Sequence, residues 1–265
     1  MVADPGGESP SPCGFAAHPG DATAQAQSLD RLSRQVAADI RDHGYGTISN
    51  RFLPDEIDQA RAQAEQALAR NGGDYAGVAG NQTFQGAVLH DLAESGPFTA
   101  LCSAVYSELY GRRASDMRLR QTLRCLTDRS AAGHSDYFHY DSYAITAVIP
   151  IAIPAAGGGG DLILLPNRRP LRRTYLANLI DKALAERQGA QRSFRRALDA
   201  GAGPQRVRLV PGNVYLFLGY RSLHANEPCG EGFLRATLIL HAIDPHAGSP
   251  LKRLLGRLRH PWRHA

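Results

Sequence analysis

The sequence predicts a mainly β domain with flanking helices, an α+β architecture, within a chain of 265 residues. Two observations predict it. Amphipathic, helix-like segments occupy the chain before Met117, whereas short alternating or β-branched segments separated by turns follow it. Such a series of short strands is typical of an antiparallel barrel or sandwich, and barrels of this length are commonly single domains. We therefore expect one domain, at 28–246.

The first part of the chain is expected to be helical. Residues 1–27 are rich in Pro, Gly, Ser and Ala, and we expect them to form a disordered tail. After Ser28, a candidate N-cap, apolar residues recur at helical spacing as far as Gly44, which can end the helix. The other elements expected before Met117 are a strand at 45–49, a helix beginning near Pro54, a loop-rich segment at 74–96 and a helix at 97–111.

The second part is expected to supply the sheet. MRLRQTLRCLT, from Met117, alternates apolar and polar residues with a period of two, as a half-buried strand does. YAITAVIPIAIP is a long β-branched run, and the glycine turn GGGGDLILLP leads into a short buried strand. After the strand that begins at Met117, the expected strands lie at 143–154, 157–166, 207–211, 213–219 and 233–243.

Two segments lie outside this pattern of strands. Residues 168–201 have apolar positions at helical spacing, so we expect a helical insertion carried by the β core. The C-terminal tail, 247–265, is basic and amphipathic and is expected to form a surface helix followed by loose chain.

Composition and charge narrow the function classes. The formal net charge is +5, and 28 of the 30 basic residues are arginines. No Lys/Arg block interleaved with aromatics is present, which argues against nucleic acid as a partner, while the charge would suit an anionic small substrate. The N-terminus does not resemble a secretory signal, no apolar run is long enough for a transmembrane helix, and four scattered cysteines form no CxxC pair. We expect a cytoplasmic protein.

The pattern His-x-Asp occurs twice within GHSDYFHYDSYAITAVIP. Residues two apart on an extended chain point to the same side, so either pair could present two ligands to one metal. His139 and Asp141 directly precede a long strand, where rigid backbone fixes ligand geometry. His134 and Asp136 lie in a glycine-started loop. Position therefore favours the second pair as ligands and places the first near the mouth of the site.

Two later strands supply the remaining candidate residues. His224 lies at the end of the apolar segment NVYLFLGYRSLHAN, so it can join His139 and Asp141 in a facial triad, which suits non-haem Fe(II). Arg235 and Thr237 share one face of the strand FLRATLILHA. A buried, inward-facing arginine requires an anionic partner. Its planar guanidinium, beside a threonine hydroxyl, can bind the distal carboxylate of a dicarboxylate ligand through two parallel hydrogen bonds.

Together these residues resemble the motif of the Fe(II)/2-oxoglutarate-dependent dioxygenases, in which HxD is followed by a distal His and then by an Arg. The step Arg235-Ala236-Thr237 resembles the family's Arg-x-Ser/Thr motif for the C5 carboxylate of 2-oxoglutarate. GGGGDLILLP resembles the glycine turn between two barrel strands, and PGNVYLFLGYRSLHAN resembles the strand that leads to the distal histidine. The resemblance covers about residues 30–245.

The resemblance implies a double-stranded β-helix, or jelly roll, with N-terminal helices and the helical insertion. It implies Fe(II) held by His139, Asp141 and His224, with 2-oxoglutarate on Arg235 and Thr237 and O2 as the oxidant. No catalytic residue beyond the metal ligands is implied. Such enzymes release succinate and CO2 and usually hydroxylate a second substrate, here expected to be a small molecule such as an amino acid derivative or biosynthetic intermediate. The carboxylate ligand favours hydroxylation over halogenation.

Alternatives from other classes remain open. PGNVYLFLGYRSLHAN also resembles the second motif of cupin-like metalloenzymes, with His224 and Asn226 in place, but the His-x-His and nearby Glu of their first motif are missing. A non-catalytic binding module on the same barrel is the third candidate. Near the site, we interpret His241 as structural. Whether Tyr137 and Arg124 reach the pocket depends on strand register, which sequence does not fix, and we expect that they do not.

Overall fold

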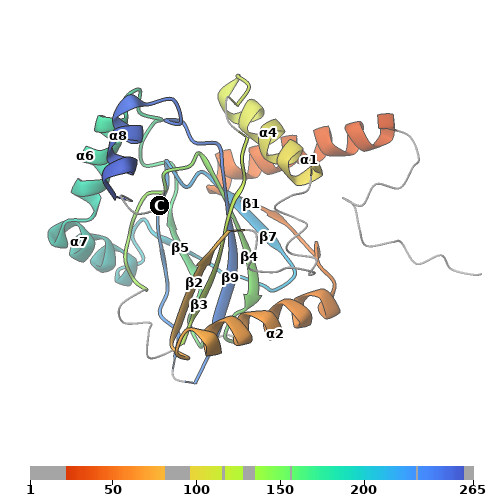
Figure 1. Cartoon of the computed structure of the whole chain (residues 1–265), viewed down its shortest axis with the longest axis vertical. Coiled ribbons are helices and arrows are strands. Elements are labelled where there is room, and N and C mark those ends of the chain that lie inside the picture. Colours follow the sequence, from red (N-terminus) through yellow and green to blue (C-terminus); the bar gives the residue numbers. More distant parts are fainter. Residues whose placement is uncertain are drawn as a thin grey trace, which may run out of the picture.

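Two antiparallel β-sheets form the centre of the protein (Figure 1). The structure is a computed structural model, and it describes residues 22–80, 96–114, 117–127, 135–155, 157–230 and 232–259. The larger sheet has the strand order β1 (Tyr45–Ile48), β7 (Val214–Phe217), β4 (Ile145–Ala152), β9 (Arg235–Ala242), β3 (Arg120–Leu126), β2 (Tyr75–Ala79). The smaller sheet has the order β6 (Gln205–Val207), β5 (Leu162–Leu165), β8 (Leu223–Asn226).

The two faces of the larger sheet have different surroundings. Leu238 and Leu240 of β9 belong to a buried cluster with residues of the N-terminal helices, whereas Arg235 and Thr237 alternate with them along the strand. Val148 of β4 and Leu162 of β5 belong to a separate cluster that joins the two sheets. Because side chains alternate along each strand, one face of the larger sheet packs against helices and the other encloses the interior between the sheets.

Three helices cover the outer face of the larger sheet. They are α1 (Ala22–His43), α2 (Pro54–Arg70) and α4 (Gly96–Tyr110). Ile40, Ile57 and Leu101 are buried in the cluster that these helices form with the sheet. The α2 helix begins with Pro54, which needs no backbone N–H there, and Glu56 accepts a hydrogen bond from the backbone N–H of Leu53.

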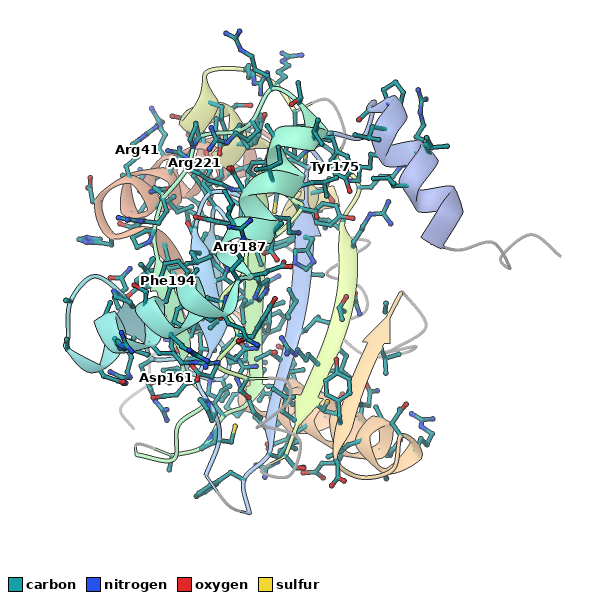
Figure 2. The ribbon with its side chains drawn as sticks, turned by 90° about the vertical axis from the view of Figure 1, so that its left-hand side faces the viewer. Arg41, Asp161, Tyr175, Arg187, Phe194 and Arg221 are labelled. Carbon is teal, nitrogen blue, oxygen red and sulfur yellow. The ribbon has the colours of Figure 1, made fainter. Side chains whose placement is uncertain are left out.

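The predicted insertion forms two helices, α6 (Tyr175–Ala185) and α7 (Gln188–Asp199). Figure 1 shows them with α8 (Pro250–Arg259) on the side of the strands away from α1 and α4. Figure 2 looks onto this side, with Tyr175 at the start of α6 near α8 and Phe194 on α7. The insertion and the C-terminal helix therefore share one side of the barrel.

Buried polar contacts fasten the insertion to the core. Gln191 of α7 accepts a hydrogen bond from the Phe138 N–H at 2.9 Å and donates to the Phe138 carbonyl at 2.7 Å. The guanidinium of Arg169 lies between the rings of Tyr140 and Tyr220, at 4.0 and 4.3 Å from their centroids, and forms an ion pair with Asp181. The first contact holds Phe138 and the second holds Tyr140, the two residues that flank His139. The insertion therefore supports the segment that carries His139 and Asp141.

Several expected elements differ from those observed. The α1 helix begins at Ala22 rather than Ser28, because the Ala- and Gln-rich residues before Ser28 favour helix. Part of the segment expected to be loop-rich, 74–96, is β2, and residues 81–95 of it lie outside the described residues. His224 lies within a strand, β8, rather than after one. The strand expected at 207–211 is instead β6, at 205–207, and residues 208–211 are not in a strand. Within the described ranges, no helix is long and apolar enough to span a membrane.

Replacing Gln191 with alanine is expected to lower the free energy of unfolding by about 2–3 kcal/mol, because both backbone groups of Phe138 lose a buried partner. Denaturant unfolding of purified protein measures the change. Gln188→Ala, at an exposed position of the same helix, is the control and should stay within about 0.5 kcal/mol of wild type. Equal stability of the two variants would contradict this role.

Candidate metal centre

An isolated β-bridge holds the two predicted histidine ligands against each other. The His139 N–H donates to the His224 carbonyl at 3.0 Å, and the His224 N–H donates to the His139 carbonyl at 3.1 Å. The imidazole centroids are 4.4 Å apart. Because directly paired residues of an antiparallel bridge point to the same side, the backbone alone brings both rings to one place.

The donor atoms form a cluster that fits one metal ion. One ligand atom each of His139, Asp141 and His224 lies within 4.8 Å of the others. The Nδ1 atoms of His139 and His224 are each 3.0 Å from a backbone carbonyl, of Tyr137 and Ser222 respectively. Nδ1 must carry the proton in these contacts, so each Nε2 presents its lone pair to the cluster. Two imidazoles and one carboxylate are the donor set that non-haem Fe(II) accepts.

Close packing fixes the position of the Asp141 carboxylate. Thr146 Oγ1 donates a hydrogen bond to Asp141 Oδ2 at 2.5 Å, and the Asp141 N–H donates to the Gly219 carbonyl at 3.0 Å. A Cβ at Gly219 would overlap both Asp141 Oδ2 and Thr146 Oγ1. Glycine is therefore required at position 219 because the carboxylate lies directly against that backbone.

Charges around the cluster favour the protonation states that a metal requires. Burial, with a further contribution from His224, lowers the pKa of His139 to about 4, so this imidazole is neutral at neutral pH. Burial alone would raise the pKa of Asp141, but His224 and His241 outweigh it and hold the pKa well below its usual range. A neutral imidazole beside an ionised carboxylate needs no proton release before it binds a cation.

A cavity of about 260 Å³ opens onto the cluster from between the sheets. It is lined by all three candidate ligands and by apolar side chains that include Val148, Leu162 and Ile239, with further lining from Tyr75, Thr122, Arg124, Thr146, Phe217, Asn226 and His241. Apolar and aromatic side chains thus share the wall with polar and charged ones, so the cavity offers both apolar contact and hydrogen-bonding groups to a small molecule.

Two residues that line this cavity, His241 and Arg124, were not expected to do so from the sequence. His241, interpreted as structural, places Nε2 at 3.5 Å from Asp141 Oδ2, because β9 pairs it directly with Thr146 of β4. Arg124 lines the cavity and is hydrogen-bonded to Tyr75 of β2. The period-two pattern of each strand could have indicated the inward face, but only the observed register shows which inward residues lie together.

Arg235 and Thr237 lie farther along the same face of β9. Arg235 is 1 % exposed, donates from Nε to the Gly160 carbonyl at 2.8 Å and from Nη1 to Thr237 Oγ1 at 3.3 Å. Neither Arg235 nor Thr237 lines the cavity at the triad, although Ile239 and His241, on the same face of β9, do. Burial and the charge of Arg124 lower the pKa of Arg235 to about 10, so the group stays positive at neutral pH.

Of the other His-x-Asp pair, the structure describes only Asp136. His134 lies outside the described residues. The carboxylate of Asp136 forms an ion pair with Arg195 of α7 at 2.6 Å. Tyr137 is 45 % exposed and does not line the cavity, although its ring stacks beside His139 at 6.5 Å. Asp136 therefore fastens the insertion.

No protein-family model and no curated protein matches the sequence. Several solved structures, however, resemble the structure of this chain. SnoK, a non-haem α-ketoglutarate-dependent carbocyclase from nogalamycin biosynthesis, gives a TM-score of 0.54 at 16 % identity over 82 % of this chain and 86 % of its own. A prolyl hydroxylase from Trichoplax adhaerens, in complex with a peptide of hypoxia inducible factor, gives 0.53 at 15 % identity over 87 % and 98 %. The epimerase SnoN, from the same biosynthesis as SnoK and also α-ketoglutarate-dependent, gives 0.50 at 18 % over 83 % and 82 %.

The chain shares their fold. The expected jelly roll with N-terminal helices is confirmed by this likeness and by the two facing antiparallel sheets. At these identities the likeness establishes architecture only, so the metal and its ligands stay predictions that rest on the geometry of the cavity.

Replacing His139 with alanine is expected to weaken metal binding by at least about 10-fold, because an intact triad needs both imidazoles. Titration of metal-free protein with Co(II), followed by its absorption spectrum, measures binding without turnover. His134→Ala is the matched control and is expected to bind as wild type does. Retention of the metal by His139→Ala together with its loss in His134→Ala would show that the first pair supplies the ligands.

Proposed function

We propose that the protein is an Fe(II)- and 2-oxoglutarate-dependent oxygenase that oxidises a small molecule, most simply by hydroxylation. The observation that carries the proposal is that the buried Arg235 lies on the same face of β9 as Ile239 and His241, which line the cavity at the triad. Among the described residues, no carboxylate forms an ion pair with this buried guanidinium. A buried charge without a partner is costly, so Arg235 calls for an anionic ligand within the barrel.

Each part of the site has a role in this reaction. His139, Asp141 and His224 would hold the iron, which supplies O2 activation coupled to decarboxylation of 2-oxoglutarate. Arg235 and Thr237 bind the far carboxylate of the cosubstrate, a charge-assisted contact with defined direction. Val148 and Ile239 exclude water from the space between them. Thr146 and Gly219 keep the carboxylate ligand in one orientation.

The size of the cavity supports a small substrate. A volume of about 260 Å³ lies just below the usual range of about 300–1,000 Å³ for ligand sites and must also hold the cosubstrate. Among the structural neighbours, SnoK is named a carbocyclase and SnoN an epimerase, while the Trichoplax enzyme is a prolyl hydroxylase that binds a peptide. One fold thus supports different outcomes, and hydroxylation is proposed here as the simplest of them.

Incubation of the purified protein with Fe(II), 2-oxoglutarate and O2 tests the proposal. Succinate should accumulate, slowly without a second substrate, and only when iron and O2 are both present. A metal-binding protein that neither binds nor decarboxylates 2-oxoglutarate would contradict the proposal and favour the cupin-like alternative. Absence of both metal and 2-oxoglutarate binding would favour a non-catalytic module.

Replacing Arg235 with glutamine should raise the 2-oxoglutarate concentration for half-maximal succinate formation by about 10- to 100-fold, because a hydrogen bond to a charged group contributes about 1.5–3 kcal/mol. Arg124→Gln removes the other guanidinium of the interior and is the matched comparison. A large increase in Arg124→Gln with none in Arg235→Gln would reassign the carboxylate to Arg124.

A further inference from the structure

The chain contains only two lysines, and the structure places both near the residues that follow Asp141. Lys182 lies on α6, and its Nζ donates to Ser142 Oγ at 3.1 Å. Lys252 lies on α8, and its Nζ is 5.7 Å from the ring centroid of Tyr143. The helical insertion and the C-terminal helix, whose roles the proposed function leaves open, thus each direct an amine to one side of the metal centre.

The two amines differ in their partners. Lys252 forms an ion pair with Asp244 and also lies over Tyr175. Lys182 has the Ser142 hydroxyl as its partner, and within the described residues no carboxylate lies at ion-pair distance from it. An ammonium group has three donors, so one hydroxyl leaves most of its hydrogen-bonding capacity unused.

The surroundings of Lys182 are unfavourable for an isolated cation. Its side chain is half-buried, and this burial lowers its pKa. Arg169 and Lys252 add positive charge nearby, and the opposing charges of Asp141 and Glu186 act from beyond contact distance. A half-buried cation with no anion in contact is stabilised when an anion joins it.

The position of Lys182 separates it from the proposed cosubstrate anchor. Asp141 lies beside His241, near the C-terminal end of β9. The Ala144 N–H donates a hydrogen bond to the carbonyl of Ile243, which follows the last residue of β9. Arg235 begins the same strand. Ser142 and Lys182 therefore lie towards one end of β9 and Arg235 at the other, with Asp141 between them. A dicarboxylate held by Arg235 leaves Lys182 available to a different molecule.

We propose that Lys182 binds an anionic group, a carboxylate or a phosphate, of the second substrate and so orients that substrate at the metal centre. This inference rests on the proposed function and names the substrate class: small acids or phosphate esters rather than neutral molecules. It assigns the helical insertion the role of carrying the recognition group, while the sheets carry the metal ligands and the cosubstrate anchor.

Reductive methylation with isotopically labelled formaldehyde tests this inference, because two lysines and the N-terminal amine are the reactive groups. The protein is loaded anaerobically with Fe(II) and saturating 2-oxoglutarate, and methylation of each lysine is followed by peptide mass spectrometry. The probes are benzoate, phenyl phosphate and neutral benzamide. Benzoate or phenyl phosphate should slow methylation of Lys182 at least 5-fold, benzamide should not, and Lys252 should react equally in every case.

Protection by benzamide equal to that by the anions would overturn the inference, as would an unchanged rate with both anions. Thermal unfolding decides the case in which Lys182 is unreactive from the outset. The better anion should raise the unfolding midpoint of the loaded wild type by at least 2 °C. Lys182→Met should abolish this increase, and Arg173→Met, which removes an exposed cation of the same insertion, should retain it. No increase in wild type, or an equal one in Lys182→Met, overturns the inference.

Failure of this inference is distinguishable from failure of the proposed function. Binding of 2-oxoglutarate and formation of succinate do not depend on the probes. If both occur while neither anion protects Lys182, the oxygenase proposal stands and the anionic substrate is excluded. If an anion protects Lys182 but 2-oxoglutarate does not bind, the anion site stands and its link to oxygenation is lost.

Discussion

The bridge between His139 and His224 is the contact on which the rest of the site depends. Two backbone hydrogen bonds join a segment before β4 to a strand of the smaller sheet, and thereby bring together residues that are far apart in the sequence. Because the backbone makes this connection, neither imidazole needs to be positioned by its own side-chain torsions alone. Asp141 follows His139 by two residues, and the absence of a side chain at Gly219 leaves space for the Asp141 carboxylate beside the two imidazoles.

The two halves of the architecture perform separate tasks. Paired strands restrict the backbone, so the sheets suit groups that require fixed geometry, namely the candidate metal ligands and Arg235. The helices α6, α7 and α8 are fastened to this frame by side-chain contacts such as those of Arg169 and Gln191. Helices attached in this way can differ in sequence without disturbing strand register, so the side chains that they present can change while the frame of the candidate metal site stays the same.

Spacing and strand position were sufficient to predict that His139, Asp141 and His224 lie together, and that Arg235 and Thr237 share one face of β9, because period-two alternation determines which residues share a face. They were insufficient for His241 and Arg124, whose neighbours depend on the register between strands distant in sequence. The β2 strand was missed because its alternation is short and glycine-containing. Helical periodicity predicted the insertion, but no local pattern indicates which side chain of α6 meets Ser142.

Phe138 connects the helical insertion to the candidate metal centre. Its backbone is held by Gln191 of α7, and the next residue is His139. A cation at the triad and an anion at the insertion would therefore both order the same short stretch of chain. Coupling free energies are reciprocal, so whichever ion arrives first reduces the conformational cost of the second. Occupancy of the metal centre and of the insertion would then be cooperative, and apparent iron affinity would depend on substrate concentration.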